Sequence, residues 1–139
     1  MNFFWRFLQQ AGSNYVFCSI PGIPDLLHDG LDVLLYAGDV DYICNWLGNK
    51  KWALDLEWDG KTDFVAAEDK PWMLSNGENM GRIRSHENFK FLQVYNAGHM
   101  VPMDQPQAAS EMLNSWLDGS LGMTCSRHQK TKPPIHEFM

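Results

Sequence analysis

The sequence feature that most constrains the fold is a short apolar run that ends in acidic residues. Residues 33–41 read VLLYAGDVD, in which an aliphatic stretch is followed abruptly by Gly-Asp-Val-Asp. An apolar run of this length, bounded by a Gly/Asp turn, is typical of a buried parallel strand. In open α/β sheets, functional side chains follow the carboxyl ends of such strands. We therefore predict that Asp39 and Asp41 lie where chemistry is commonly placed.

A second unit repeats this plan further along the chain. Residues 89–95 are strand-like and lead into Asn-Ala-Gly-His, so that His99 follows the second strand as Asp41 follows the first. Each strand is succeeded by a helical segment, over residues 42–56 in the first unit and 105–117 in the second. The pattern predicts an α/β fold with an acid and a histidine at consecutive strand ends.

Shorter signals complete the expected architecture. Pro24 and Gly30 bracket a short helix, because proline favours the first turn of a helix and glycine its end. An Asn-Gly pair predicts a β-hairpin over residues 71–84. At the start of the last helix, Asp104 and Gln107 have the spacing of a capping box, in which two side chains bond the first backbone N–H groups.

Apolar periodicity predicts which faces of the two longer helices are buried. The predicted faces are Ile43, Trp46 and Leu47 in the first helix, and Ala108, Met112 and Trp116 in the second. A glycine at position 48 weakens the first helix and is a possible break within it. Gly119 is the expected end of the second helix.

Composition excludes several classes of partner and site. The net charge of −6 argues against nucleic acid, whose binding proteins carry a basic face. No apolar run approaches the roughly 20 residues that span a bilayer, so no membrane partner is expected. The three cysteines, Cys18, Cys44 and Cys125, are odd in number and widely spaced. They fit neither a disulfide framework nor a zinc motif, and we predict no metal and no cofactor.

Asp41 and His99 have the chain order of two members of a hydrolase triad. In such a triad the histidine takes a proton from the nucleophile, and the acid accepts a hydrogen bond from the other ring nitrogen. In α/β-hydrolases the chain order is serine, then acid, then histidine. On spacing alone, a structural role for the histidine stays open.

Two long motifs resemble those of the serine carboxypeptidases. The first is YAGDVDYICNWLGN at residues 36–49, and the second is GHMVPMDQP at residues 98–106. The resemblance runs from about Pro24 to Leu117. It implies the C-terminal part of an α/β-hydrolase fold and the removal of C-terminal amino acids from peptides at acidic pH. The implied partners are the C-termini of peptides or proteins, and the implied location is the vacuole, the lysosome or outside the cell.

The resemblance also implies roles for individual residues. Asp41 matches the catalytic acid and His99 the catalytic base, while Asp39 matches a structural acid of the turn. Cys44 and Met100 match positions beside the pocket for the leaving residue. The alternatives for these two are a small buried hydrophobic residue at Cys44 and ordinary core packing at Met100.

The nucleophile of such a triad is missing from the sequence. The family carries its serine in a Gly-x-Ser-x-Gly elbow, and no such motif occurs here. Two strand–helix units also cannot cover both faces of a parallel sheet. We therefore expect the C-terminal third of a larger hydrolase, either as a fragment or as a truncated gene product. The expected organisation is a poorly matched segment over 1–23, a carboxypeptidase-like part over 24–120 and a flexible tail over 121–139.

Two functions are compatible with this reading. In the first, Asp41 and His99 complete a serine carboxypeptidase triad with a serine from outside the chain. In the second, the chain is a truncated, non-catalytic carboxypeptidase-like protein that binds a partner through exposed apolar surface. Another α/β-hydrolase, such as an esterase, is disfavoured by the length of the two motifs. Under either reading, we expect the 139-residue chain alone to be inactive.

Overall fold

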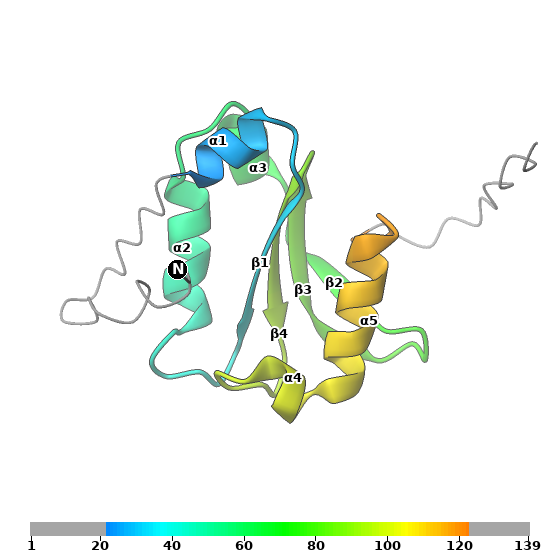
Figure 1. The fold of residues 1–139 in the computed structure, drawn as a ribbon. Helices are drawn as coiled ribbons and strands as arrows, with labels where there is room; N and C mark the ends of the chain where they lie inside the picture. Colours follow the sequence, from blue (N-terminus) through cyan, green and yellow to red (C-terminus); the bar gives the residue numbers. More distant parts are fainter. Residues whose placement is uncertain (1–21, 123–139) are drawn as a thin grey trace, which may run out of the picture.

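The computed structural model describes residues 22–122 and has a four-stranded sheet at its centre, in the order β1-β4-β3-β2 (Figure 1). The strands are β1 (Val33–Gly38), β2 (Lys70–Met73), β3 (Asn79–His86) and β4 (Phe89–Val94). β1 pairs with β4 in parallel, and the other two pairs are antiparallel. Because Gly38 is in register with Val94, β1 and β4 end together and the loops after them begin side by side.

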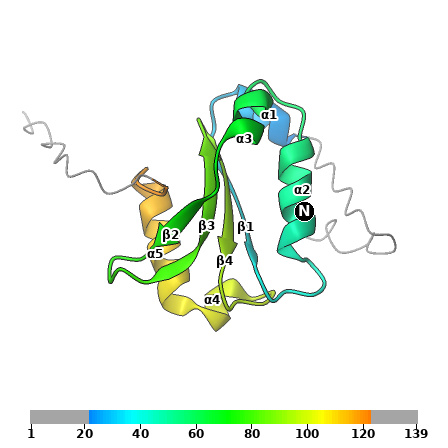
Figure 2. The same cartoon turned by 180° about the vertical axis from the view of Figure 1, so that it is seen from behind.

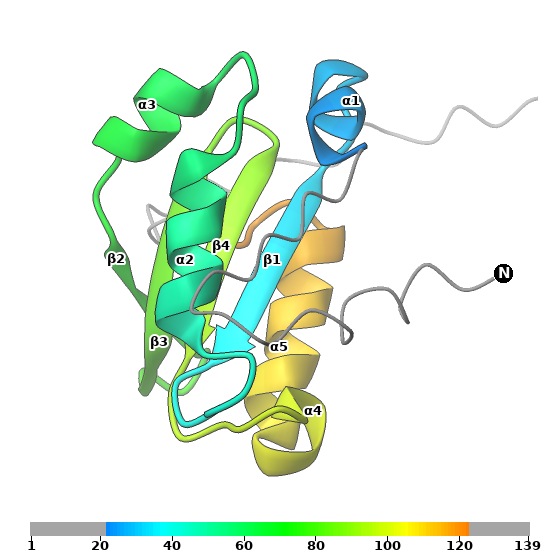
Figure 3. The ribbon, with the colours of Figure 1, turned by 90° about the vertical axis from the view of Figure 1, so that its left-hand side faces the viewer.

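Helices cover both faces of this sheet (Figure 1). They are α1 (Ile23–His28), α2 (Trp46–Asp55), α3 (Lys61–Ala66), α4 (Val101–Asp104) and α5 (Pro106–Leu117). α2 and α5 lie on opposite sides of the strands, with α1 and α3 near one end of the sheet and α4 at the other (Figure 3). The expectation that two strand–helix units leave a face uncovered was wrong, because the two long helices take one face each.

The core accordingly has two parts, one on each side of the sheet. On the side of α5, Leu92 and Val94 of β4 pack with Ala108 and Met112. On the side of α2, the core is aromatic, and the rings of Phe64 and Phe89 stack with their centroids 4.7 Å apart. The buried residues of this second cluster are Leu27, Ala53, Phe64, Phe89 and Phe91. Phe64 comes from α3, a helix that the sequence analysis did not predict.

Most of the elements predicted from local signals are confirmed. β1, β4 and the antiparallel hairpin of β2 with β3 lie where they were expected. Gly30 and Gly119 follow the ends of α1 and α5 with positive φ angles of 78° and 77°. The hairpin turn reaches toward α5, where the Ser75 backbone N–H donates to a Glu111 carboxylate oxygen at 2.7 Å (Figure 2). This bond ties the hairpin to the last helix.

The predicted buried face of the first long helix was wrong. α2 begins only at Trp46, because the Asn45 side chain caps it by accepting from the Gly48 N–H at 2.8 Å. Ile43 therefore lies outside the helix, and Ile43 and Leu47 are 66% and 62% exposed. The helix continues past the glycine without a break and buries Ala53 against the sheet.

The predicted capping box at the last helix was also wrong. α5 begins at Pro106 after Gln105, and no side chain caps its first turn. The Gln107 amide instead donates to Glu111 within the helix. The Asp104 carboxylate accepts a hydrogen bond from the Gly98 N–H, outside both α4 and α5. On the predicted apolar row, Ala108 and Met112 are buried.

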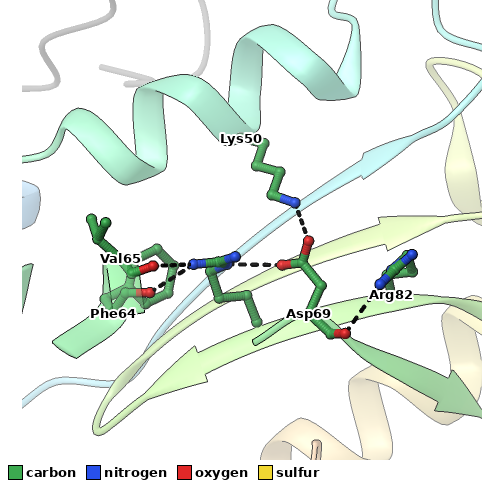
Figure 4. A network of polar contacts seen from close by, with 6 residues as sticks. Lys50, Phe64, Val65, Asp69 and Arg82 are labelled. Atoms are coloured by element: carbon green, nitrogen blue, oxygen red, sulfur yellow. Dashed lines mark hydrogen bonds and ion pairs between the residues drawn. The ribbon is translucent and has the colours of Figure 1, made fainter. Parts of the chain in front are cut away.

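A polar network around Asp69 joins α2 and α3 to the hairpin (Figure 4). The Asp69 carboxylate pairs with Lys50 of α2, and with Arg84 of β3 at 2.8 Å. The Arg84 guanidinium also donates to the carbonyls of Phe64 and Val65 in α3, at 3.0 and 2.7 Å. The Asp69 side chain is only 18% exposed, so a largely buried carboxylate and two cations fix three elements relative to one another.

Substitution Asp69→Ala should therefore lower the free energy of unfolding by about 3 kcal/mol, because it leaves two cationic side chains without their partner. Urea unfolding at pH 7 measures the change. Asp55→Ala is the matched control, because the Asp55–Lys51 pair lies on the surface with side chains 63% and 59% exposed. Its loss should change stability by less than about 1 kcal/mol. Equal losses in the two variants would contradict a structural role for the network.

The contribution of Asp69 should also depend on pH. Burial raises the pKa of this carboxyl, but hydrogen bonds from Lys50 and Arg84 outweigh burial and bring its pKa below the ordinary value of 3.8. The stabilisation is therefore complete above that value and is lost as the pH falls through the lowered pKa of the folded state. The stability difference between the natural chain and Asp69→Ala should shrink below about pH 4.

Candidate active site

Two loops meet where β1 and β4 end. The acid loop comprises residues 39–45 and the histidine loop comprises residues 95–100 (Figure 3). The Val40 N–H donates to the Ala97 carbonyl at 3.1 Å, which joins the two loops directly. Gly38 permits this approach, because a Cβ atom there would lie 2.1 Å from the Ala97 carbonyl oxygen. The glycine that ends β1 therefore brings the acid loop against the histidine loop.

Asp41 is held by its own loop. Its Oδ1 accepts hydrogen bonds from the backbone N–H groups of Ile43 and Cys44, each at 2.9 Å. Its Oδ2 lies 3.0 Å from Nδ1 of His99. The Asp41 side chain is 7% exposed, whereas that of His99 is 53% exposed. The structure thus places the predicted acid and histidine side by side, with the acid buried and the imidazole open to solvent.

These contacts determine the ionisation of the acid. Burial raises the pKa of Asp41, but the Cys44 N–H, the His99 ring and the Ile43 N–H together outweigh burial and lower the pKa below 3.8. An ionised carboxylate can only accept hydrogen bonds, so Nδ1 of His99 is the donor. In the neutral imidazole, Nε2 is then the unprotonated nitrogen, which can take a proton from a hydroxyl or thiol.

The other predicted site residues lie around this pair. Cys44 is half-buried, and one ligand atom each from Asp41, Cys44 and His99 lie within 4.8 Å of one another. Such a group could hold a metal ion, but both Asp41 oxygens already accept hydrogen bonds, which favours an acid–histidine pair. Met100 is 57% exposed, which disagrees with the core-packing alternative. Cys18 and Cys125 lie outside the residues that the structure describes.

Asp39 lies at the same edge of the sheet but does not contact His99 through a hydrogen bond. Its backbone N–H donates to the Val94 carbonyl at 3.0 Å, which continues the pairing of β1 with β4 by one residue. Its Oδ1 atom is buried and has no hydrogen-bond partner among residues 22–122. Of the two acids that follow β1, only Asp41 pairs with the histidine.

Sequence reasoning missed two residues that hold the histidine loop. Asp104 accepts a hydrogen bond from the Gly98 N–H at 2.8 Å, and the Gln105 amide donates to the Asn96 carbonyl at 3.0 Å. Both belong to the motif at residues 98–106. The helix-capping pattern drew attention to Asp104, but nothing in the spacing indicated that its carboxylate points back to the loop.

The surface around the pair is apolar and exposed. Tyr42 is 94% exposed beside the buried Asp41, and four further residues of the surrounding segments are more than half exposed. They are Val40, Ile43, Met100 and Met103. Within residues 22–122, no hydrogen bond of His99 involves a serine. In the same range, none of the helices has the length and apolar character needed to cross a bilayer.

Comparison with known proteins gives matches to serine carboxypeptidases. The family model described as serine carboxypeptidase matches residues 7–119. Carboxypeptidase Y of Schizosaccharomyces pombe is 57% identical over 96 residues, which are 69% of this chain and 10% of that protein. A serine carboxypeptidase-like protein of Pisum sativum is 48% identical over 109 residues, 78% of this chain and 38% of the relative. The chain thus spans well under half the length of these relatives.

A solved structure agrees with the sequence matches. A prohormone-processing carboxypeptidase from Saccharomyces cerevisiae superposes with a TM-score of 0.62 at 31% sequence identity. The superposition covers 72% of this chain and 22% of that one. The four-stranded sheet and its helices therefore correspond to part of an α/β-hydrolase fold.

The close approach of Gly38 to the Ala97 carbonyl can be tested by substitution, because the contact between the acid loop and the histidine loop depends on it. Gly38→Ala should lower the free energy of unfolding by about 3 kcal/mol, because the new methyl group meets a backbone carbonyl that cannot move without separating the loops. Gly48→Ala is the control, because the nearest side-chain atoms to its Cβ would be those of Asn45, at 3.4 Å or more. The control should be slightly stabilising, since alanine is the better helix former. Urea unfolding compares the two, and similar stabilities would refute the proposed constraint.

Proposed function

The chain belongs to the serine carboxypeptidase family, and from this premise we propose that Asp41 and His99 are the acid and the general base of a Ser-Asp-His triad. The serine in this proposal comes from a segment outside the present sequence. The observation that carries the proposal is the 3.0 Å contact between His99 Nδ1 and Asp41 Oδ2, at the ends of two parallel, adjacent strands.

The proposed reaction follows from the hydrogen bonds at the pair. Nε2 of His99 takes the proton of the serine hydroxyl as the serine oxygen attacks the carbonyl of the last peptide bond. Asp41 stabilises the resulting imidazolium through Nδ1. The imidazolium then gives its proton to the amine of the departing C-terminal residue, which leaves an acyl-enzyme. Water, deprotonated by the same imidazole, attacks the acyl-enzyme; the bond to the serine oxygen breaks, the imidazolium returns its proton to that oxygen, and the shortened peptide is released.

Membership of the family supports a peptide substrate. In the proposed enzyme, Cys44 and Met100 contact the leaving residue, as the motif resemblance implies, and the 57% exposure of Met100 is compatible with this role. The family supports a vacuolar, lysosomal or secreted location, and Asp41, whose pKa is lowered, is ionised in each of these settings.

A reconstitution experiment separates this function from the non-catalytic alternative. The chain is joined to the serine-bearing N-terminal part of a related carboxypeptidase, and the product is tested with a blocked dipeptide and a serine-directed fluorophosphonate. We expect turnover and covalent labelling in the joined protein, and neither in the 139-residue chain alone. A folded joined protein that neither turns over the dipeptide nor takes the label would favour a binding role.

In the active joined protein, Asp41→Asn should reduce kcat by roughly 10⁴-fold, because an amide no longer selects the productive imidazole tautomer. Steady-state hydrolysis of the blocked dipeptide measures this effect. Asp29→Asn makes the same chemical change at the end of α1, at the opposite end of the sheet, and should leave kcat unchanged. An unaltered kcat in Asp41→Asn would reject the assignment and point to Asp39 instead.

A further inference from the structure

We propose that Asp104 is a positioning residue for His99, acting through the backbone of the histidine loop. The inference rests on the proposed function, because it concerns the orientation of the His99 imidazole that acts as the base in that function. Asp104 Oδ2 accepts a hydrogen bond from the Gly98 N–H at 2.8 Å, one residue before the histidine. A Cβ atom at Gly98 would lie 3.2 Å from this oxygen, so the glycine leaves room for the carboxylate.

The single turn of α4 brings Asp104 back to the loop. The N–H groups of Met103 and Asp104 both donate to the Met100 carbonyl, at 2.8 and 3.0 Å. The chain therefore reverses directly after His99, and the last residue of the turn faces the residue before the histidine. The loop, α4 and the start of α5 form one short closed unit.

Each residue that leads into the histidine is anchored by one backbone atom. The Asn96 carbonyl accepts from the Gln105 amide at 3.0 Å, and the Ala97 carbonyl accepts from the Val40 N–H at 3.1 Å. The Gly98 N–H donates to Asp104. Asn96 also has a φ of 54°, a conformation that non-glycine residues seldom adopt and that needs support from its surroundings. The Asp104 bond is the anchor nearest the imidazole.

His99 depends on such anchoring because its own side chain has little packing to orient it. The side chain is 53% exposed, and its hydrogen bond within residues 22–122 is the one to Asp41. A shift of the backbone moves Nε2 relative to the attacking hydroxyl, and a displacement of about 1 Å can cost about 10²-fold in rate. Fixing Gly98 therefore fixes the point from which the imidazole projects.

The hydrogen-bond partner of Asp104 indicates that its carboxylate stabilises the histidine loop rather than α5. Asp104 lies one residue before Gln105, the N-cap of α5, and its carboxylate bonds to Gly98 rather than to the first turn of that helix. An acid that served only the helix would bond the N–H groups of its first turn.

Asp118 offers a matched comparison. It is an exposed aspartate whose Oδ1 accepts from the Ser120 N–H at 2.9 Å, at the far end of α5 from the site. Asp104→Ala and Asp118→Ala each remove one negative charge and one carboxylate–backbone hydrogen bond. Asp104→Asn is the conservative variant, because its amide oxygen can still accept from Gly98.

The first measurement needs no catalytic activity. In the full 139-residue chain, NMR follows the His99 Nδ1 proton that is shared with Asp41. We expect a downfield resonance in the natural chain, in Asp118→Ala and in Asp104→Asn. We expect it to broaden or disappear in Asp104→Ala. If Asp104→Ala and Asp118→Ala give the same resonance as the natural chain, the inference is wrong.

The second measurement uses the active joined protein. Asp104→Ala should lower kcat about 10²-fold with KM changed less than about twofold. Asp104→Asn should recover most of the loss, and Asp118→Ala should match the natural protein. Equal kcat values for the two alanine variants would overturn the inference. A joined protein without activity would count against the proposed function alone, since the NMR comparison still decides the positioning.

If Asp104→Ala does not fold, a milder substitution, Gln105→Ala, tests whether the anchored loop orients His99. Gln105→Ala removes the anchor at Asn96 and leaves every charge in place. If the anchored loop aims His99, this variant should broaden the shared proton and lower kcat while keeping KM. A Gln105→Ala protein with both properties unchanged would contradict the inference.

Discussion

The parallel pairing of β1 with β4 is the constraint on which the site depends. Its register ends both strands at one edge, so two loops that are far apart in the sequence leave the sheet side by side. Gly38 then lets the acid loop contact the Ala97 carbonyl, and the Val40 N–H closes the gap with a hydrogen bond. A shift of one residue between these strands would move the carboxylate and the imidazole out of hydrogen-bonding distance.

The two members of the pair are held by different means. Asp41 is buried, and two backbone N–H groups of its own loop fix its orientation before it meets the imidazole. These donors offset the cost of burying a charge, and in the proposed reaction they need no reorganisation when the imidazole becomes positive. His99 is exposed and relies on anchors in its backbone. This arrangement suits a group that must reach a second reactant while its partner stays fixed.

The sequence was sufficient for features that short-range physics determines. Apolar runs, an Asn-Gly turn and the glycines at positions 30 and 119 located the strands, the hairpin and the helix ends. The sequence was insufficient where contacts between residues far apart in the chain determine the structure. The buried face of α2 follows from the Asn45 cap and from the sheet, which left Ile43 exposed. α3 is short and polar, and its one fully buried residue, Phe64, finds its partner in β4. The Asp41–His99 contact was expected from the resemblance of the two motifs, because the sheet order β1-β4-β3-β2 does not follow from the order of the strands in the sequence.

The exposure of side chains differs between the framework of the fold and the edge that carries Asp41 and His99. The Asp69 network and the two cores fix the framework, where the charged groups of the network are paired and the large core side chains are buried. At the edge where β1 and β4 end, the opposite holds: the large side chains of Tyr42 and Met100 are exposed to solvent, and the charged side chain of Asp41 is buried. In the proposed enzyme, a serine-bearing segment and the substrate meet the pair from this open side. Removing water there strengthens the bond between carboxylate and imidazolium, because charges attract more strongly at lower dielectric.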